Sequence, residues 1–102
     1  MASFREIIDQ NIPVLVDFHA TWCGPCQVMS PILEEVKKEL GEDVKVIKID
    51  IDRNQKLASQ LGVRGVPTFI LYKNGKQLWR QSGIISKNEL LDRISQSHSN
   101  VM

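Results

Sequence analysis

Two β-rich segments flank an amphipathic helix in the first half of the chain, and this order leaves few folds open. Val14–Phe18 is mostly apolar and β-rich, which is typical of a strand buried on both faces. From residue 24 to 40 the apolar residues recur with a helical period, and Gly41 ends the predicted helix. Val44–Ile51 then alternates as a second strand. Two strands joined by such a helix predict a right-handed parallel crossover.

The second half of the chain contains a hairpin signal. Thr68–Tyr72 and Gln77–Arg80 are β-rich and flank the dipeptide Asn74-Gly75. Asn-Gly is the strongest short hairpin signal because a type I′ turn needs positive φ at both central residues. The hairpin is therefore expected to add antiparallel strands to the sheet that the crossover begins.

Helix start signals complete the order of elements. Ser3–Glu6 and Ser86–Glu89 each fit a capping box, in which a serine and a glutamate three positions later satisfy free N–H groups at a helix start. Asp52 is expected to cap a further helix that ends near Leu61, and residues 98–102 are expected to fray. Helices must then cover both faces of a mixed four-stranded sheet in an α/β fold.

Length and composition exclude several classes of protein. Residues 1–102 are expected to form one domain of 11.6 kDa. The 13 Lys and Arg and 12 Asp and Glu residues are interspersed and leave a net charge of +1, so neither a nucleic-acid nor a membrane partner is expected. No apolar run is long enough to cross a bilayer. The N-terminus resembles no signal peptide, so we expect a cytoplasmic protein unless a signal has been removed.

Both cysteines lie in Cys23-Gly24-Pro25-Cys26, where the predicted first strand ends and its helix begins. At the helix N-cap the Cys23 sulfur would face free N–H groups of the first turn, which favour the thiolate. The thiolate is the nucleophile in disulfide exchange. Gly24 lets another chain approach closely, and Pro25 suits the first helical turn. Cys26, one turn further in, would attack a mixed disulfide on Cys23 and release the product.

Two other interpretations of the cysteine pair are less favourable. A zinc site needs four ligands, and only Cys23, Cys26, His19 and His98 are available. A purely structural cysteine pair does not explain the position between strand and helix, and a disulfide across two residues closes a very short loop. Dithiol–disulfide exchange is therefore the favoured chemistry.

The segment from Val16 to Cys26, followed by Pro31, resembles the thioredoxin family, as do Arg64–Phe69, Lys73–Gly75 and Gly83. The match covers nearly the whole chain, and Trp-Cys-Gly-Pro-Cys is highly specific for the family. The resemblance implies the thioredoxin fold and a protein-disulfide reductase with no bound cofactor. It also implies a monomer that acts on disulfide-containing proteins and receives electrons from NADPH through a flavin-dependent thioredoxin reductase.

The resemblance also assigns roles around the redox disulfide Cys23–Cys26. Cys23 resembles the attacking cysteine and Cys26 the resolving one. Pro67 resembles the proline whose preceding peptide bond is cis, which would turn the Val66 backbone toward a substrate strand. The residues implied as a weakly polar docking surface are Trp22, Gly24, Pro25, Gly65, Val66, Gly83 and Ile84.

Asp17 is a carboxylate within the apolar first strand. A buried unpaired charge is costly, so such a group has a raised pKa or a partner, unless Asp17 is a solvated residue near the strand end. The resemblance makes Asp17 the proton acceptor for Cys26, through water. It places Lys48, on the paired strand, near this carboxylate.

The sequence departs from the common family pattern in three places. His19 replaces a tryptophan, and is either a packing residue or a charge that changes the thiolate fraction between about pH 5 and 8. Gln27 stands where many relatives have lysine, which leaves the substrate preference open. The chain starts too late for the usual first strand, so four strands are expected, with Val44–Ile51 at the edge.

Two other functions remain possible at this stage. One is a thiol–disulfide protein dedicated to an oxidative or specialised partner, because a fold does not decide function. The other is a binding module that uses the same surface without redox chemistry. A reduction potential would separate the first from a reductase, and a Cys23→Ser protein that keeps its full cellular role would identify the second.

Overall fold

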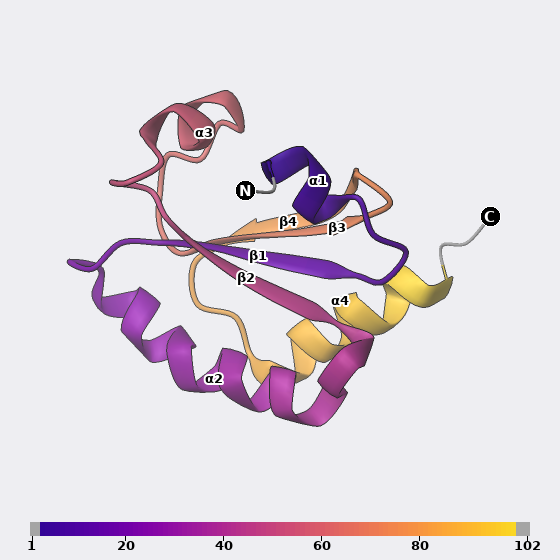
Figure 1. The fold of residues 1–102 in the computed structure, drawn as a ribbon. Helices are drawn as coiled ribbons and strands as arrows, with labels where there is room; N and C mark the ends of the chain where they lie inside the picture. The colour runs from indigo at the N-terminus through magenta and orange to yellow at the C-terminus, as the bar shows by residue number, and fades with distance from the viewer. Residues whose placement is uncertain (1–2, 100–102) are drawn as a thin grey trace.

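The computed structural model describes residues 3–99 (Figure 1). A four-stranded sheet lies between two layers of helices. In chain order, the elements are α1 (Phe4–Ile8), β1 (Val14–His19), α2 (Gly24–Leu40), the short 3-10 helix η1 (Gly41–Asp43), β2 (Lys45–Asp50), α3 (Gln55–Gln60), β3 (Thr68–Lys73), β4 (Lys76–Ser82) and α4 (Lys87–Ser99). No helix among residues 3–99 has the length and apolar character needed to cross a bilayer.

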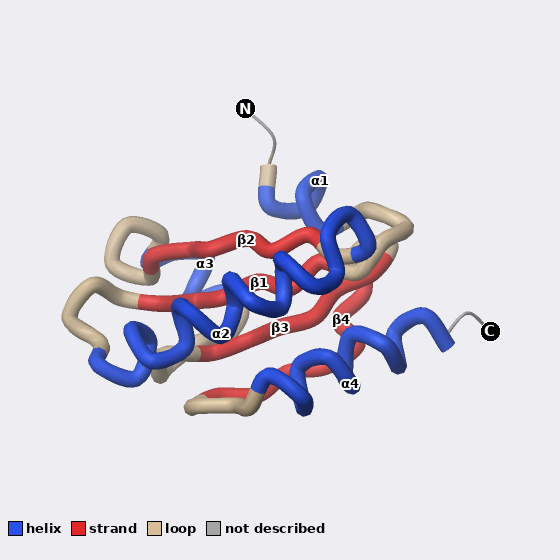
Figure 2. Tube along the Cα trace, turned by 90° about the horizontal axis from the view of Figure 1, so that it is seen from below, coloured by secondary structure: helices blue, strands red, loops and turns tan. Residues whose placement is uncertain are grey.

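The strand order is β2-β1-β3-β4 (Figure 2). β1 and β2 are parallel and are connected through α2, whereas β1–β3 and β3–β4 are antiparallel. The prediction of a mixed four-stranded sheet is confirmed. β2 lies at the edge, as expected for Val44–Ile51, and residues 4–8 form a helix rather than an additional strand.

The helices divide between the two faces of the sheet. α2 and α4 cover one face, and α1 and α3 cover the other (Figure 1). The buried residues under α2 and α4 are Leu15, Met29, Leu33, Val36, Val44, Phe69, Leu71, Ile85, Leu90 and Ile94. Those under α1 and α3 are Ile8, Val14, Val16, Phe18, Ala58, Val63, Ile70 and Tyr72. Alternate residues of β1 therefore enter opposite clusters, as a strand buried on both faces requires.

Several local sequence patterns are found in the structures that they predicted. Asn74 and Gly75 have φ values of 53° and 78°, which are those of a type I′ hairpin turn. The Ser3 hydroxyl accepts from the Glu6 N–H at 3.2 Å, and the Glu6 carboxylate accepts from the Ser3 N–H at 3.2 Å, which completes the capping box. The Ser86 hydroxyl likewise accepts from the N–H of Glu89 at 3.1 Å.

One predicted boundary was wrong. The helix expected to start after Asp52 begins at Gln55, because the preceding residues form turns and the Asp52 N–H donates to the Asp50 carboxylate at 2.8 Å. α4 continues to Ser99, and the buried Ser97 hydroxyl donates to the Ile94 carbonyl of the same helix. Residues 100–102 of the tail that was expected to fray lie outside the described part of the chain.

Candidate active site at the end of β1

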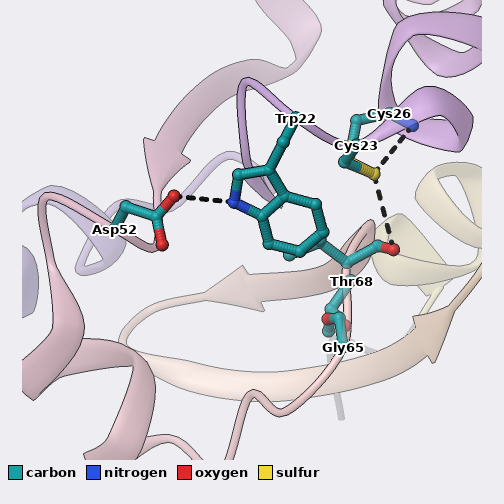
Figure 3. The surroundings of a disulfide bond; sticks show 7 residues. Trp22, Cys23, Cys26, Asp52, Gly65 and Thr68 are labelled. Carbon is teal, nitrogen blue, oxygen red and sulfur yellow. Dashed lines mark hydrogen bonds between the residues drawn. A yellow bond between two sulfur atoms is a disulfide. The ribbon is translucent and has the colours of Figure 1, made fainter.

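Cys23 and Cys26 form a disulfide at the start of α2, with their Cα atoms 5.3 Å apart. Cys23 is the N-cap of the helix and has extended backbone angles. Its Sγ accepts a hydrogen bond from the Cys26 N–H at 3.1 Å (Figure 3). The N-cap position predicted for Cys23 is confirmed. After reduction, the same N–H group and the positive end of the helix dipole favour a thiolate at this sulfur.

The exposure of the two cysteines differs from the predicted order. Cys23 is only 3% exposed, whereas Cys26 is half-buried. The expectation that Cys26 lies further inside is therefore wrong for the oxidised protein. The reason is tertiary: the carbonyl oxygen of Val66 lies 3.6 Å from the Cys23 Sγ and belongs to a loop that covers this sulfur (Figure 3).

This covering loop joins α3 to β3 and is fixed by its own hydrogen bonds. The Val66–Pro67 peptide bond is cis, as the resemblance implied. The Thr68 hydroxyl donates to the Gly65 carbonyl at 2.6 Å. The N–H of Gly83 donates to the Pro67 carbonyl at 2.9 Å, which brings the segment after β4 to the same place. Two predicted docking segments, far apart in sequence, therefore meet beside the disulfide.

Large apolar side chains next to these segments are open to solvent. Trp22 is 67% exposed and Ile84 is 56% exposed. The other predicted docking residues include exposed Gly24, Pro25 and Gly65, whereas Val66 and Gly83 are half-buried. Exposed apolar surface of this kind is typical of a site that contacts other proteins.

Trp22 has a partner that the sequence did not reveal. Its indole N–H donates to the Asp52 carboxylate at 2.8 Å (Figure 3). Sequence analysis assigned Asp52 to a helix start, and no local pattern indicates the bond because the residues are 30 positions apart. Val28, on the second turn of α2, was also missed as an exposed apolar residue. Its place in the helical pattern, away from Met29 and Leu33, was the available signal.

Asp17 lies in the middle of β1 and is 5% exposed. The interpretation of Asp17 as a solvated strand-end residue is therefore wrong. Lys48 is its Cα partner across β1 and β2. Among the described residues, the Asp17 Oδ1 has no hydrogen-bond partner. Burial raises the pKa of Asp17 from 3.8 to about 6, against the opposing positive charges of His19 and Lys48.

A hollow of about 220 Å³ connects this carboxylate with the disulfide. It is lined by Asp17, His19, Ala20, Thr21, Cys26, Gln27, Ser30 and Lys48. The structure thus brings Asp17, the implied proton acceptor, together with Cys26 and with Lys48, which the resemblance placed near this carboxylate. The two departures from the family pattern, His19 and Gln27, lie at the same hollow.

The rest of the described chain offers no group of three or more His, Cys, Asp or Glu side chains placed to hold a metal ion. The groups present at the site are the two sulfurs, the helix N-terminus and the buried carboxylate. These groups suit thiol–disulfide exchange, in which a thiolate attacks a disulfide and a second thiol resolves the product.

Comparisons with known proteins agree with this geometry. The Thioredoxin family model matches residues 1–96. A thioredoxin from Rickettsia felis is 47% identical over 93 residues, covering 91% of this chain and 89% of that protein. A chloroplastic thioredoxin Y from Oryza sativa subsp. japonica is 46% identical over 94 residues, covering 91% of this chain and 56% of that protein.

Solved structures of thioredoxins have the same fold as this chain. A thioredoxin from Trypanosoma brucei brucei superposes with a TM-score of 0.85 and 31% identity, covering 95% of this chain and 84% of that one. A mutant thioredoxin from Halobacterium salinarum NRC-1 superposes with a TM-score of 0.82 and 41% identity, covering 95% and 87%.

Proposed function

Because the chain belongs to the thioredoxin family and is a thiol–disulfide oxidoreductase, we propose that it reduces protein disulfides and is recharged by a thioredoxin reductase. The observation that supports this most is the position of Cys23, whose sulfur accepts the Cys26 N–H at the start of α2. At such a site Cys23 can act as the attacking thiolate of disulfide exchange. NADPH would supply the electrons through a flavin-dependent reductase. A reducing compartment such as the cytoplasm is where this activity is useful.

The proposed reaction has two exchange steps. The Cys23 thiolate attacks one sulfur of a substrate disulfide, forms a mixed disulfide and displaces the other substrate sulfur as a thiolate. The Cys26 thiol then gives its proton to the Asp17 carboxylate through water. The Cys26 thiolate attacks the Cys23 Sγ, forms the Cys23–Cys26 disulfide and displaces the second substrate sulfur. Two electrons pass to the substrate, and each displaced thiolate takes up a proton.

The docking surface explains how a protein substrate reaches a covered sulfur. The Val66 backbone next to Cys23 would pair with an extended substrate strand, while exposed Trp22 and Ile84 contact its side chains. A strand in this position lies along the loop that covers Cys23 in the oxidised protein. The substrate disulfide would then lie next to the attacking sulfur.

Reduction of insulin with NADPH and a thioredoxin reductase tests the function. We expect turnover that depends on all three components. Reduction by chemically reduced protein without turnover by the reductase would contradict the proposed electron donor. A reduction potential close to that of an oxidase would contradict the reductase itself.

Single cysteine variants test the two sulfur roles. Cys26→Ser should accumulate mixed disulfides through Cys23, because attack occurs and resolution does not. Cys23→Ser is the matched control and should accumulate few, since Cys26 lacks the N-cap position. Because Cys26 is the more exposed of the two residues in the oxidised protein, equal trapping by both variants is the outcome that would reject the assignment.

A further inference from the structure

His19 ends β1 two residues after Asp17, and both side chains line the hollow that reaches Cys26. We propose that His19 is a positioning residue of the reaction, which passes the proton received by Asp17 on to solvent. This inference rests on the proposed reductase function and deepens it. It assigns the route by which Asp17 passes on the proton of Cys26 while the mixed disulfide is being resolved.

The geometry of β1 places the two groups in sequence along the hollow. Residues two apart on a strand point to the same face and are separated by about 6.6 Å. Asp17 is buried, and His19 is half-buried. The carboxylate therefore lies at the inner position and the imidazole at the outer one. A water in the hollow between them would bridge the carboxylate and the imidazole.

Of the titratable groups around the hollow, His19 is the one suited to accept the proton from Asp17. From β2, Lys48 is paired with Asp17, and Asp50 is paired with His19. From α2, Cys26 is the titratable group, and Gln27 and Ser30 are uncharged. Lysine is already protonated at neutral pH and cannot accept a proton. Histidine is the side chain whose charge changes between about pH 5 and 8.

The proton transfers balance in each turnover. The Cys26 thiol gives its proton to the Asp17 carboxylate, and the electron pair left on sulfur forms the new bond to Cys23. The Asp17 carboxylic acid gives this proton to neutral His19, which becomes an imidazolium and releases the proton to solvent. The electron pair of the broken mixed disulfide leaves on the substrate sulfur. The positive charge of His19 also lowers the pKa of Asp17, which supports this direction of transfer.

Titration of the Asp17 carboxyl carbon by NMR tests the coupling between the two groups. In the oxidised wild type, in which the disulfide-bonded Cys26 does not titrate, the signal should move in two steps, because interacting groups share their titration. His19→Gln should give one step with a midpoint higher by about 0.5–2 pH units, the range expected for two charges at this distance. His19→Lys should also give one step, at a lower midpoint than His19→Gln. Ser30→Ala, at the same hollow, is the control and should keep the two steps.

The rate at which the mixed disulfide is resolved near pH 7 tests the proton transfer itself. His19→Gln should slow this step by about tenfold, which is below the usual effect of a direct general base. Added imidazole should restore it. His19→Lys should also be slow although it keeps the charge, since lysine cannot accept the proton. Thermal melting of each variant first confirms that it is folded.

The outcomes separate this inference from the proposed function. Wild-type resolution rates in His19→Gln, together with slow resolution in Asp17→Asn, would overturn the role of His19 and leave the function intact. A titration of Asp17 that His19→Gln does not move would overturn it as well. If Asp17→Asn itself resolves at the wild-type rate, the proposed role of Asp17 fails and the role of His19 fails with it.

Discussion

The two faces of the sheet bury similar apolar layers but are covered by very different helices. α1 and α3 have 5 and 6 residues, whereas α2 and α4 have 17 and 13. Helices shorter than about 12 residues are marginal alone in water, so the short pair depends on tertiary contacts. The hairpin and the strands provide them. The N–H groups of Asn74 and Gly75 donate to the carbonyls of Gln10 and Ile8, just after α1 and at its last residue. Arg80 donates to the carbonyls of the two residues that follow α3.

β1 shows what this difference means for function. Its side chains toward α1 and α3, Val14, Val16 and Phe18, are all apolar and fully buried. The alternate residues of β1, on the side of α2 and α4, are Leu15, Asp17 and His19. On the side of the short helices, β1 therefore contributes only apolar core residues. On the side of the long helices, it contributes a buried carboxylate that lines the same hollow as Cys26.

Phe18→Ala should have the largest effect, because this side chain is fully buried under the short helices. Removing a buried phenylalanine costs about 3–5 kcal/mol of unfolding free energy. At roughly 4–8 °C per kcal/mol, the melting temperature should fall by on the order of 20 °C. Phe18→Leu is the milder control. A loss below about 1 kcal/mol in denaturant unfolding would show that this face does not provide the stability assigned to it.

Asp17→Ala, one residue away and on the other face of the sheet, should increase the unfolding free energy at neutral pH instead of decreasing it. The folded pKa of about 6 exceeds the unfolded value of about 3.9, so the native state binds the proton more tightly. The stability gained from protonated Asp17 is therefore fully present below about pH 4 and is lost as pH rises through 6. At pH 7 and above, the variant should be more stable than the wild type by up to about 3 kcal/mol.

The same substitution should slow disulfide reduction, most strongly near neutral pH, because Cys26 ionises without assistance at high pH. Unfolding free energies at pH 4 and pH 7.5, together with reduction rates across pH 5–9, provide the measurements. Asp17→Asn keeps the shape of the side chain and serves as the control. A destabilised variant with full activity would mean that Asp17 has only a structural role.

Arg80→Met should remove the bonds that hold the end of α3 and keep the apolar stem of the side chain. Its guanidinium donates to the carbonyls of Leu61 and Gly62 at 2.6 and 2.7 Å. Hydrogen bonds from a charged group are worth about 1.5–3 kcal/mol, so we expect a loss of about 2 kcal/mol. Lys56→Met, at an exposed position of the same helix, should change little. Resolution of mixed disulfides should be unaffected, and a slowed rate would show that the two faces are coupled.

Ser3→Ala should have the smallest effect and is confined to α1. Loss of an N-cap side chain costs about 1 kcal/mol. Ser3→Asp, which keeps an acceptor at this position, should remain close to the wild type. Hydrogen exchange of the α1 amides reports the change locally. Equal exchange in both variants would show that the hairpin contacts, rather than the capping box, hold this helix.

Local patterns were sufficient for much of this protein. The type I′ turn at Asn74-Gly75, the capping box at Ser3 and the N-cap position of Cys23 each depend on a few neighbouring residues. The parallel crossover follows from the order of strand and helix signals, because a connection of that length can close in few ways. Even the cost of burying Asp17 was predictable, since apolar residues surround it in its own strand.

Other properties depended on segments that meet only in the folded chain. Cys23 is covered by the Val66 carbonyl, which belongs to a loop more than 40 positions away, so its exposure could not be read from its place on the helix. Asp52 bonds to Trp22 instead of capping α3 for the same reason. His19 lines the hollow of Asp17 and Cys26 because β1, β2 and α2 meet there. Burial and charge environment are sums over all neighbours in space, and a local pattern contains only those that are also neighbours in sequence.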